Sequence, residues 1–505
     1  MASPGSNASN NVIVLIILAV CSLFSISSVM QSSHLAGSKE NLRSHLIRDI
    51  DAPTRLKKKN VHSSNLRPIN SESNDSPHVE LSSDEQSADE VPSGEHPTDE
   101  PVADESPSND NDNSIEEFDV CIAGAGLSGA VIAERYASQL DQSVIVIEKR
   151  NHIGGNCYDY IDGDTGIRVS QYGAHLFHTI NKRVWDYVHQ FSEWTKYEHE
   201  VVGIVNGSHV PIPVNIETVN TLFGENITDT KQMDEWLANE QVKYDHEPRN
   251  SEEIALSRVG KRLYELIFHP YTIKQWNKEP KELGPEVTAR IPVRNNHDNR
   301  YFGDPYQALP SDGYTRIFEN LLCHPKIEVR VNTDYFKLKD NLRCKHTYFT
   351  GPIDAYFAHM GYKKLEYRSL DFERQVVKDI GLTETYQPKF VVNHPSADAN
   401  FTRIVEYKHL LNQTSEHTIL FIERSKDGGE PYYPVPNEEN KALYRRYQEL
   451  AEKEPNVTFV GRLANYKYFN MDQAILNALE LFDKDTGHKE ENDGPIATCV
   501  PKTQQ

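Results

Sequence analysis

The chain has 505 residues and a formal net charge of −22, with 53 Lys and Arg against 75 Asp and Glu. The length allows about two to four domains, and the acidic balance argues against nucleic-acid binding, because phosphate groups repel it. The six cysteines form no C-x-x-C pair and show no even spacing. They therefore predict neither a disulfide framework nor a zinc site, which favours a reducing compartment.

The N-terminal region predicts a membrane anchor. After a short tail at 1–11, residues 12–30 form an uncharged, mostly apolar stretch close to the ~20 residues that a spanning helix needs. A cleaved signal peptide is the alternative, because small residues such as Ser25, Ser27 and Ser28 lie near its end. Lys and Arg follow the span and none precedes it, so the positive-inside rule places the catalytic region in the cytosol rather than in the Golgi lumen.

Residues 31–116 predict a disordered acidic stem. Between Ser71 and Phe118 the chain has 16 Asp or Glu and no Lys or Arg, and such a segment buries too little apolar surface to offset its ordering entropy. This stretch also accounts for most of the net charge. Residues 485–505 are polar and predict a second disordered tail, which leaves 117–484 as the folded catalytic region.

The folded region begins with a dinucleotide-binding pattern. An apolar run leads into Gly124, Gly126 and Gly129 in G-x-G-x-x-G spacing, and a helical stretch and a second apolar run follow, ending at Glu148. This order predicts strand, turn, helix and strand, in which the glycines allow a tight turn, a close approach to a pyrophosphate and close helix packing. The helix N-terminus offers free N–H groups to phosphate, and Glu148 is placed to accept the ribose hydroxyls.

The segment after Glu148 bears on the choice of cofactor. The basic pair Lys149-Arg150 suits the 2′-phosphate of NADP, whereas the diglycine at 154–155 suits FAD, because it lets the backbone approach the flavin side. We favour FAD. Further on, His175 and His178 stand three residues apart beside Gly173, just downstream of the cofactor motif, which favours one of them facing the ring system. Two structural histidines are the alternative. We expect no metal site, since no carboxylate or third histidine stands at ligand spacing.

Residues 215–290 have apolar positions at a spacing of about 3.6 and predict a helical insertion domain. We expect Pro270 to break the helix there. The aromatic cluster from Phe268 to Trp276 is interleaved with Thr, Lys and Gln, which is typical of a ligand wall on which a base stacks, although core packing is the alternative.

Several arginines lie in segments rich in β-branched and aromatic residues, among them Arg290, Arg368 and Arg403. Burial of a guanidinium is unfavourable unless an anion accompanies it, so the group indicates a diphosphate site; salt-bridged surface residues are the alternative. Near the end, the sequence predicts a strand at 457–460, then a turn containing Arg462 and a helix from Met471. This order suits a last contact of the chain with the cofactor.

From Phe118 to Lys484 the chain resembles UDP-galactopyranose mutases of the bacterial type. The resemblance rests on motifs in the same order: IAGAGLSGA, EKRNHIGGN, YGAHLFHT, YTIKQW, RIPVR, YFGDPYQ, LEYRSL, FTRIVEYKH, EPYYPV and GRLANYKYFNMD. It implies an α/β fold with a discontinuous Rossmann-like FAD-binding domain and a helical insertion domain at about 215–290. An antiparallel β-sheet domain is implied at about 180–214 and 300–425.

The resemblance also implies an isomerase that reversibly interconverts UDP-galactopyranose and UDP-galactofuranose, supplying galactofuranose for glycoconjugates. Reduced FAD would act as the nucleophile at the anomeric carbon, with NADPH or NADH as the expected reductant. The partners would be the two nucleotide sugars, the membrane through the N-terminal helix, and a second subunit in a homodimer. The alternatives are a flavin oxidoreductase of the amine-oxidase type and a catalytically weak nucleotide-sugar binder.

The family motifs assign site residues in this chain. The implied catalytic residues are Arg290, Arg403, Tyr301, Tyr433, Tyr468 and His178. The implied substrate-binding residues are the same arginines and tyrosines together with Phe268, Tyr271, Thr272, Trp276 and Asn393. The implied cofactor-binding residues are Gly124, Gly126, Leu127, Ser128, Gly129, Glu148, Lys149, Gly155, Asn156, His175, Arg368, Arg462, Asn470 and Met471.

One position departs from the family pattern. Asn470 stands where the family usually has Asp, and the amide keeps the size and the hydrogen-bonding capacity but loses the charge. We expect low turnover if that carboxylate does more than orient a neighbouring group.

Overall fold

The structure, a computed structural model, describes residues 115–489, which lie within one compact unit. The predicted anchor, the stem up to residue 114 and residues 490–505 lie outside the described residues. Among residues 115–489, no helix is both long enough and apolar enough to cross a bilayer.

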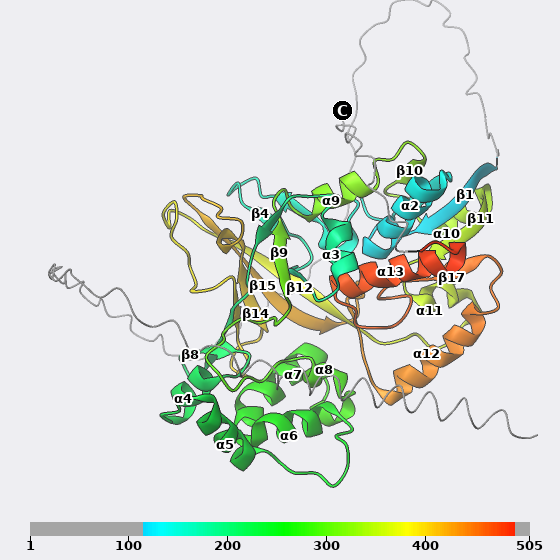
Figure 1. Cartoon of the computed structure of the whole chain (residues 1–505). Coiled ribbons are helices and arrows are strands. Elements are labelled where there is room, and N and C mark those ends of the chain that lie inside the picture. The colour runs from blue at the N-terminus through cyan, green and yellow to red at the C-terminus, as the bar shows by residue number, and fades with distance from the viewer. Residues whose placement is uncertain (1–114, 490–505) are drawn as a thin grey trace, which may run out of the picture. The chain divides into compact units, whose positions relative to one another are not determined.

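A five-stranded parallel sheet forms the dinucleotide-binding part, with strand order β10-β2-β1-β11-β17. Helices α2 (Leu127–Leu140) and α13 (Met471–Thr486) contact each other and share one apolar core with β1 and β2 (Figure 1). The predicted Rossmann-like α/β fold is therefore confirmed. The strands are β1 (Glu116–Ala123), β2 (Val144–Ile147), β10 (Ile327–Arg330), β11 (Leu342–Phe349) and β17 (Val457–Phe459).

This sheet draws its strands from distant parts of the chain. The first two strands come from its beginning and β17 with α13 from its end. Helix α13 continues to Thr486, two residues into the segment that we expected to be a disordered tail. Its residues Ile475, Leu479 and Phe482 are fully buried in the core that it shares with α2.

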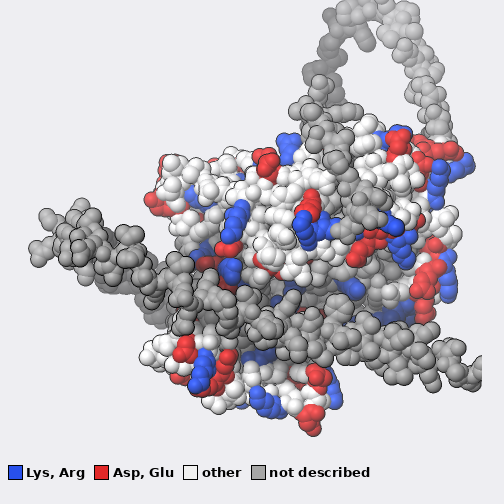
Figure 2. All heavy atoms as spheres, in the orientation of Figure 1, with Lys and Arg blue, Asp and Glu red and all other residues white. Residues whose placement is uncertain are grey.

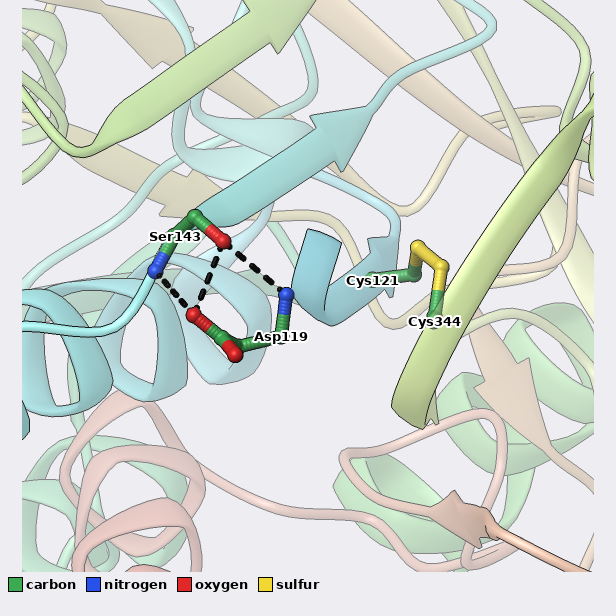
Figure 3. The surroundings of a disulfide bond; sticks show 4 residues. All are labelled: Asp119, Cys121, Ser143 and Cys344. Atoms are coloured by element: carbon green, nitrogen blue, oxygen red, sulfur yellow. Dashed lines mark hydrogen bonds between the residues drawn. A yellow bond between two sulfur atoms is a disulfide. The ribbon is translucent and has the colours of Figure 1, made fainter. Parts of the chain in front are cut away.

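A disulfide joins the first strand of this sheet to its neighbour. Cys121 of β1 and Cys344 of β11 are 223 residues apart in sequence, yet their Cα atoms are 5.8 Å apart (Figure 3). The prediction that the cysteines form no disulfide was wrong, because only the parallel pairing of β1 with β11 brings these two together. The cysteine pattern therefore no longer favours a reducing compartment.

The same strand is tied to β2 by polar contacts. Asp119 accepts hydrogen bonds from the backbone N–H of Ser143 at 2.8 Å and from its hydroxyl at 2.9 Å (Figure 3). Lys345 and Ser143, which both donate to this carboxylate, lower the pKa of Asp119 to about 2. These contacts fix the start of β2 beside β1.

The second large sheet has seven strands in the order β16-β12-β15-β14-β13-β7-β8. Its neighbours are antiparallel except for β13 and β7, which are parallel. Its strands are β7 (Val201–Val205), β8 (Ser208–Ile212), β12 (Tyr367–Val377), β13 (Val391–Asn393), β14 (Arg403–Glu406), β15 (Thr418–Asp427) and β16 (Tyr433–Pro434).

Five helices group together apart from the parallel sheet (Figure 1). The expectation that Pro270 breaks the helix was wrong: a π-helical turn at Tyr264–Phe268 leads into α7, and Pro270 lies in the first turn of α7. A missing N–H is tolerated at that position. The helices are α4 (Ile216–Phe223), α5 (Thr230–Glu240), α6 (Ser251–Leu263), α7 (His269–Trp276) and α8 (Glu286–Ala289).

Shorter elements connect these parts. Strands β5, β9 and β6 form a three-stranded sheet, and β3 pairs with β4. These elements are β3 (Asp159–Ile161), β4 (Arg168–Ser170), β5 (Phe177–Thr179), β6 (Trp194–Lys196), β9 (Tyr306–Pro310), α3 (Lys182–Val188), α9 (Tyr314–Leu321), α10 (Tyr335–Leu338), α11 (Ile353–Tyr356) and α12 (Glu438–Ala451).

Candidate active site

The glycine-rich turn after β1 requires its glycines. Gly124 has φ +112°, and a Cβ there would lie 2.1 Å from the Thr350 hydroxyl oxygen. A Cβ on Gly129 would lie 2.0 Å from the Gly124 carbonyl oxygen. Gly126 caps α2 without any side-chain hydrogen bond, so the N–H groups of the first helical turn remain available to a phosphate.

The second glycine segment lies directly on the first. Gly155 has φ +55°, and a Cβ there would lie 2.9 Å from the Cα of Gly126. The backbone N–H of Gly154 donates to the Ala125 carbonyl at 2.9 Å. Near the C-terminal end, a Cβ on Gly461 would lie 2.9 Å from the Ser128 hydroxyl oxygen. Three separated segments therefore bring bare backbone to the N-terminus of α2.

Contacts around Glu148 bear on the choice between the two dinucleotides that the sequence left open. The Glu148 carboxylate is buried and accepts the backbone N–H groups of Ala125 and Arg150, each at 2.9 Å. Lys149 and Arg150 both pair with Glu430, at 3.5 and 3.1 Å. A carboxylate thus already compensates the basic pair, which weighs against a 2′-phosphate there and favours FAD over NADP.

Beside this turn lies a cavity of about 300 Å³, a size at which small-molecule sites begin. Among residues 115–489, its lining includes three arginines and no Asp or Glu. On the outer face drawn in Figure 2, by contrast, residues of both signs are interspersed. In a chain with a net charge of −22, such a lining favours an anionic ligand.

The cavity gathers most of the predicted site residues. Every predicted catalytic and substrate-binding residue lines it: Arg290, Arg403, Tyr301, Tyr433, Tyr468, His178, Phe268, Tyr271, Thr272, Trp276 and Asn393. Of the predicted cofactor residues, the lining includes Asn156, His175, Arg462, Asn470 and Met471. The glycines, Leu127, Ser128, Glu148 and Lys149 lie at the turn described above rather than in the lining.

Arg290 is held by an aromatic ring and an amide. It caps α8, and its guanidinium carbon lies 4.0 Å from the centroid of the Tyr468 ring. One of its terminal nitrogens donates to the Asn470 side-chain oxygen at 3.0 Å. Its charge therefore has a ring face and a neutral acceptor beside it.

Arg403 is held by a buried carboxylate that the sequence did not suggest. Its Nε donates to Glu423 Oε2 at 2.6 Å; the Arg403 side chain is 26% exposed and that of Glu423 only 1%. Burial opposes the charge on Arg403, but Glu423 raises its pKa well above the ordinary range. The other carboxylate oxygen of Glu423 has no hydrogen-bond partner among the described residues.

Tyrosines surround the two arginines. The Tyr433 and Tyr468 rings are stacked, with centroids 5.0 Å apart and planes inclined by 13°. Burial raises the pKa values of Tyr271, Tyr301 and Tyr433. These three hydroxyls therefore stay protonated near neutral pH, where they can donate hydrogen bonds to an anion.

Three histidines line the cavity. His178 pairs through Nδ1 with Asp304 and stacks on Phe302, with ring centroids 3.7 Å apart. Burial lowers the pKa of His175 to about 4 and that of His199 to about 3, so both are neutral at pH 7. His199 was not predicted, because it is an isolated histidine between two glutamates and belongs to no motif.

Arg368, predicted to contact the cofactor, is not part of the cavity lining. The residue is 3% exposed, and its Nε donates to the Gln275 carbonyl at 2.9 Å. It also pairs with Asp427, and Ser425 donates to the same Gln275 carbonyl at 2.6 Å. The structure therefore places Arg368 behind α7, where it fixes the end of that helix.

Comparison with known proteins shows which family this chain belongs to. The sequence model of the UDP-galactopyranose mutase family matches residues 266–468, and that of an NAD(P)-binding Rossmann-like domain matches residues 122–191. A probable UDP-galactopyranose mutase of Klebsiella pneumoniae is 40% identical over 372 residues, which cover 72% of this chain and 94% of that protein. This chain belongs to the UDP-galactopyranose mutase family, whose members are isomerases.

Other relatives show how wide this mutase family is. A dTDP-fucopyranose mutase of Escherichia coli is 36% identical, with the match covering 72% of this chain and 96% of that protein. Among solved structures, a reduced UDP-galactopyranose mutase superposes with a TM-score of 0.56 at 17% identity, covering 73% of this chain and 94% of that one. A likeness at that identity shows a shared fold.

Proposed function

We propose that this protein interconverts UDP-galactopyranose and UDP-galactofuranose with FAD as its cofactor, and so supplies galactofuranose for glycoconjugates. One observation carries the proposal. A cavity whose lining has three arginines, several tyrosines and no carboxylate opens beside a glycine cradle built for a dinucleotide.

The chain's residues fit FAD. The glycines at 124, 126 and 155 leave room for a pyrophosphate, the N-terminus of α2 faces it, and Glu148 would hold the adenosine ribose. The late turn with Arg462 and Met471 would close the other side. When bound and reduced by NADPH or NADH, FAD would supply an electron-rich nitrogen to the anomeric carbon.

The side chains would bind and orient the nucleotide sugar. Arg290 and Arg403 would hold the diphosphate, and Tyr301, Tyr433 and Tyr468 would donate hydrogen bonds to its oxygens and to the sugar. Negative charge grows on the diphosphate as the anomeric bond breaks, so fixed guanidinium groups lower the barrier.

The side of the cavity formed by α7 and the π-helical turn before it would bind the uracil base. Phe268, Tyr271, Thr272 and Trp276 form one wall of the cavity, where an uracil ring can stack on an aromatic face. His178 has one ring nitrogen engaged by Asp304, which leaves Nε2 available to the sugar or the cofactor.

An assay with the full-length protein in detergent tests this function. The flavin is identified by its absorbance spectrum and by mass spectrometry of the released cofactor. The protein is then reduced with dithionite and given UDP-galactofuranose, and products are separated by HPLC. We expect conversion in the reduced state alone. Net oxidation of a substrate would instead indicate an oxidoreductase, and binding without conversion would indicate a nucleotide-sugar binder.

The same assay defines the substrate class. Because a dTDP-fucopyranose mutase is nearly as similar to this chain as the Klebsiella protein, dTDP-fucopyranose is assayed in parallel. We expect the UDP sugar to be turned over faster. A higher kcat/KM for the dTDP sugar would overturn that assignment and leave the mutase reaction in place.

We further propose that residues 12–30 anchor the protein in a membrane with its catalytic region in the cytosol, because the Lys and Arg residues that follow the span favour that side. We also propose that the protein forms a homodimer. Protease treatment of intact microsomes tests the first point. Protection of the catalytic region would place it in the lumen, the compartment type in which disulfides persist. Light scattering of the purified protein tests the second.

A further inference from the structure

We infer that Lys274 is a positioning residue that fastens helix α7, one wall of the cavity, to the loop between β13 and β14, which leads directly into Arg403. The inference rests on the proposed function in taking UDP as the ligand. Lys274 lies in the YTIKQW segment among residues that line the cavity, but it is not itself part of the lining.

The ammonium group of Lys274 is enclosed by backbone carbonyls. Its Nζ donates to the carbonyl oxygens of Ser396 at 2.7 Å, Phe401 at 3.0 Å and Ala399 at 3.1 Å, and it also contacts that of His394. All four carbonyls belong to residues 394–401, which join β13 to β14. One side chain thus contacts four carbonyl oxygens of this loop.

These hydrogen bonds make the conformation of the β13–β14 loop depend on the Lys274 ammonium group. Lysine is rarely withdrawn from water unless its ammonium is hydrogen-bonded, and Lys274 is half-buried. Without it, four carbonyl dipoles would converge with no common donor, and each unsatisfied group costs free energy. The loop would then have to open to let water reach them.

The loop ends at two residues of the cavity. Asn393 precedes it and Arg403 follows it, and the backbone N–H of His394 donates to the Thr402 carbonyl at 2.9 Å to close its base. Pro395, within the loop, also lines the cavity. An opened loop would therefore displace the guanidinium that we assign to the diphosphate.

The same lysine also sets the position of α7. Tyr271, Thr272, Gln275 and Trp276 line the cavity from this helix. Arg368 and Ser425 hold the helix end through the Gln275 carbonyl, and Lys274 holds it from the side of the β13–β14 loop. Two walls of the cavity thus meet at one ammonium group.

The chain offers a matched control in Lys408. Its Nζ also donates to two loop carbonyls, those of Gly381 and Ser415, each at 2.6 Å, and it is 3% exposed. Neither it nor these partners line the cavity. Lys408→Met therefore removes the same kind of interaction away from the ligand.

The first experiment compares Lys274→Met with Lys408→Met in the flavin-loaded full-length protein at pH 7. UDP affinity is measured by calorimetry, and hydrogen exchange of residues 394–402 by mass spectrometry. We expect Lys274→Met to weaken UDP binding at least tenfold, to speed exchange in that loop and to raise KM by a larger factor than it lowers kcat. Lys408→Met should leave UDP affinity within twofold and the loop exchange unchanged.

A pH series gives a second, independent readout. Burial lowers the pKa of Lys274 to about 8, against the opposing effect of Asp398. Wild-type UDP affinity should therefore fall as the pH rises through 8, when the ammonium loses its proton. Lys274→Arg should retain affinity within about threefold at pH 7 and lose this step, because a guanidinium stays charged.

Few other titratable groups near Lys274 can produce a fall in UDP affinity as the pH rises through 8. Asp398 and His394 beside the ammonium have lowered pKa values, and Tyr271 on the same helix has a raised one. His209, which interacts with His394, is checked with a His209→Gln variant that should keep the step.

Unchanged loop exchange and UDP affinity in Lys274→Met would overturn the inference, as would equal effects in Lys408→Met. If Lys274→Met fails to fold, a wild-type affinity that is flat from pH 7 to 9 would overturn it instead. If the wild type does not bind UDP at all, the proposed function fails, and loop exchange in the two variants still decides the role of Lys274.

Discussion

Arg290 and Asn470 form a contact between a charged donor and a neutral acceptor. Asn470 accepts a hydrogen bond from Arg290 and caps α13. An aspartate there would be the only carboxylate among the residues that line the cavity. The amide therefore holds the guanidinium without neutralising it, which leaves its charge for the diphosphate.

This contact predicts different effects for two substitutions. Asn470→Ala removes the acceptor of a charged donor, worth about 1.5 kcal/mol, so kcat/KM should fall about tenfold. Asn470→Asp should keep kcat within twofold but weaken UDP binding several-fold, because the carboxylate pairs with Arg290 and repels the diphosphate. Steady-state kinetics and UDP titration measure both effects, and added salt should shrink the second. A rise in kcat above tenfold in Asn470→Asp would show that the charge itself is needed.

Individual residues could be predicted where a local motif carries them. The arginines, tyrosines and aromatic wall residues were assigned from such motifs, and the cavity brings them together. Glu423 could not be found in that way. It reaches Arg403 because β14 pairs with β15 in a register that places these two residues opposite each other, and sequence alone does not set that register.

Helices and strands could be predicted from the sequence where the apolar periodicity was strong. The predicted run at 144–147 is β2, and α13 begins at Met471 as expected. Pro270 misled the prediction because the π-helical turn before it leads into α7 at His269, which leaves the proline in the first turn of the helix. The disulfide was missed for a related reason, since it depends on which strands become neighbours.

The contact between the two glycine segments predicts a specific loss of cofactor. Gly155→Ala adds a methyl group 2.9 Å from the Gly126 Cα at a residue with φ +55°, so the segments must separate. We expect at least fivefold less flavin per protein after purification, measured by absorbance.

Gly166→Ala is the matched control for that variant. Gly166 also has a positive φ, +70°, but no atom lies within 4 Å of its added Cβ. The substitution should cost only the backbone strain, about 1 kcal/mol, and keep the flavin. Equal flavin content in both variants would refute a dinucleotide site at this contact.

At the scale of the whole molecule, the dinucleotide-binding part depends on the end of the chain. β17 extends the parallel sheet beside β11, and α13 covers the core formed with α2. A chain that stops after Asn456 lacks both and exposes that core.

Truncation therefore gives a sharp prediction. The protein that ends at Asn456 should be insoluble or flavin-free, because apolar core residues lose their cover. The protein that ends at Lys489 keeps β17 and α13 and should retain its flavin and its melting temperature. Solubility, absorbance and thermal unfolding measure the difference. Flavin retained by the shorter protein would show that the last strand and helix are dispensable.

The split origin of the parallel sheet also bears on synthesis at the ribosome. β11 ends at residue 349 and β17 begins at residue 457, and at about 5 to 20 residues per second their emergence is separated by roughly 5 to 20 seconds. During that interval the β11 edge of the sheet stays open and the apolar surface that α13 covers stays exposed, both targets for chaperones. The FAD site that we propose is completed only after β17 and α13 have emerged, so a shortage of riboflavin should act after these elements have been made rather than on translation.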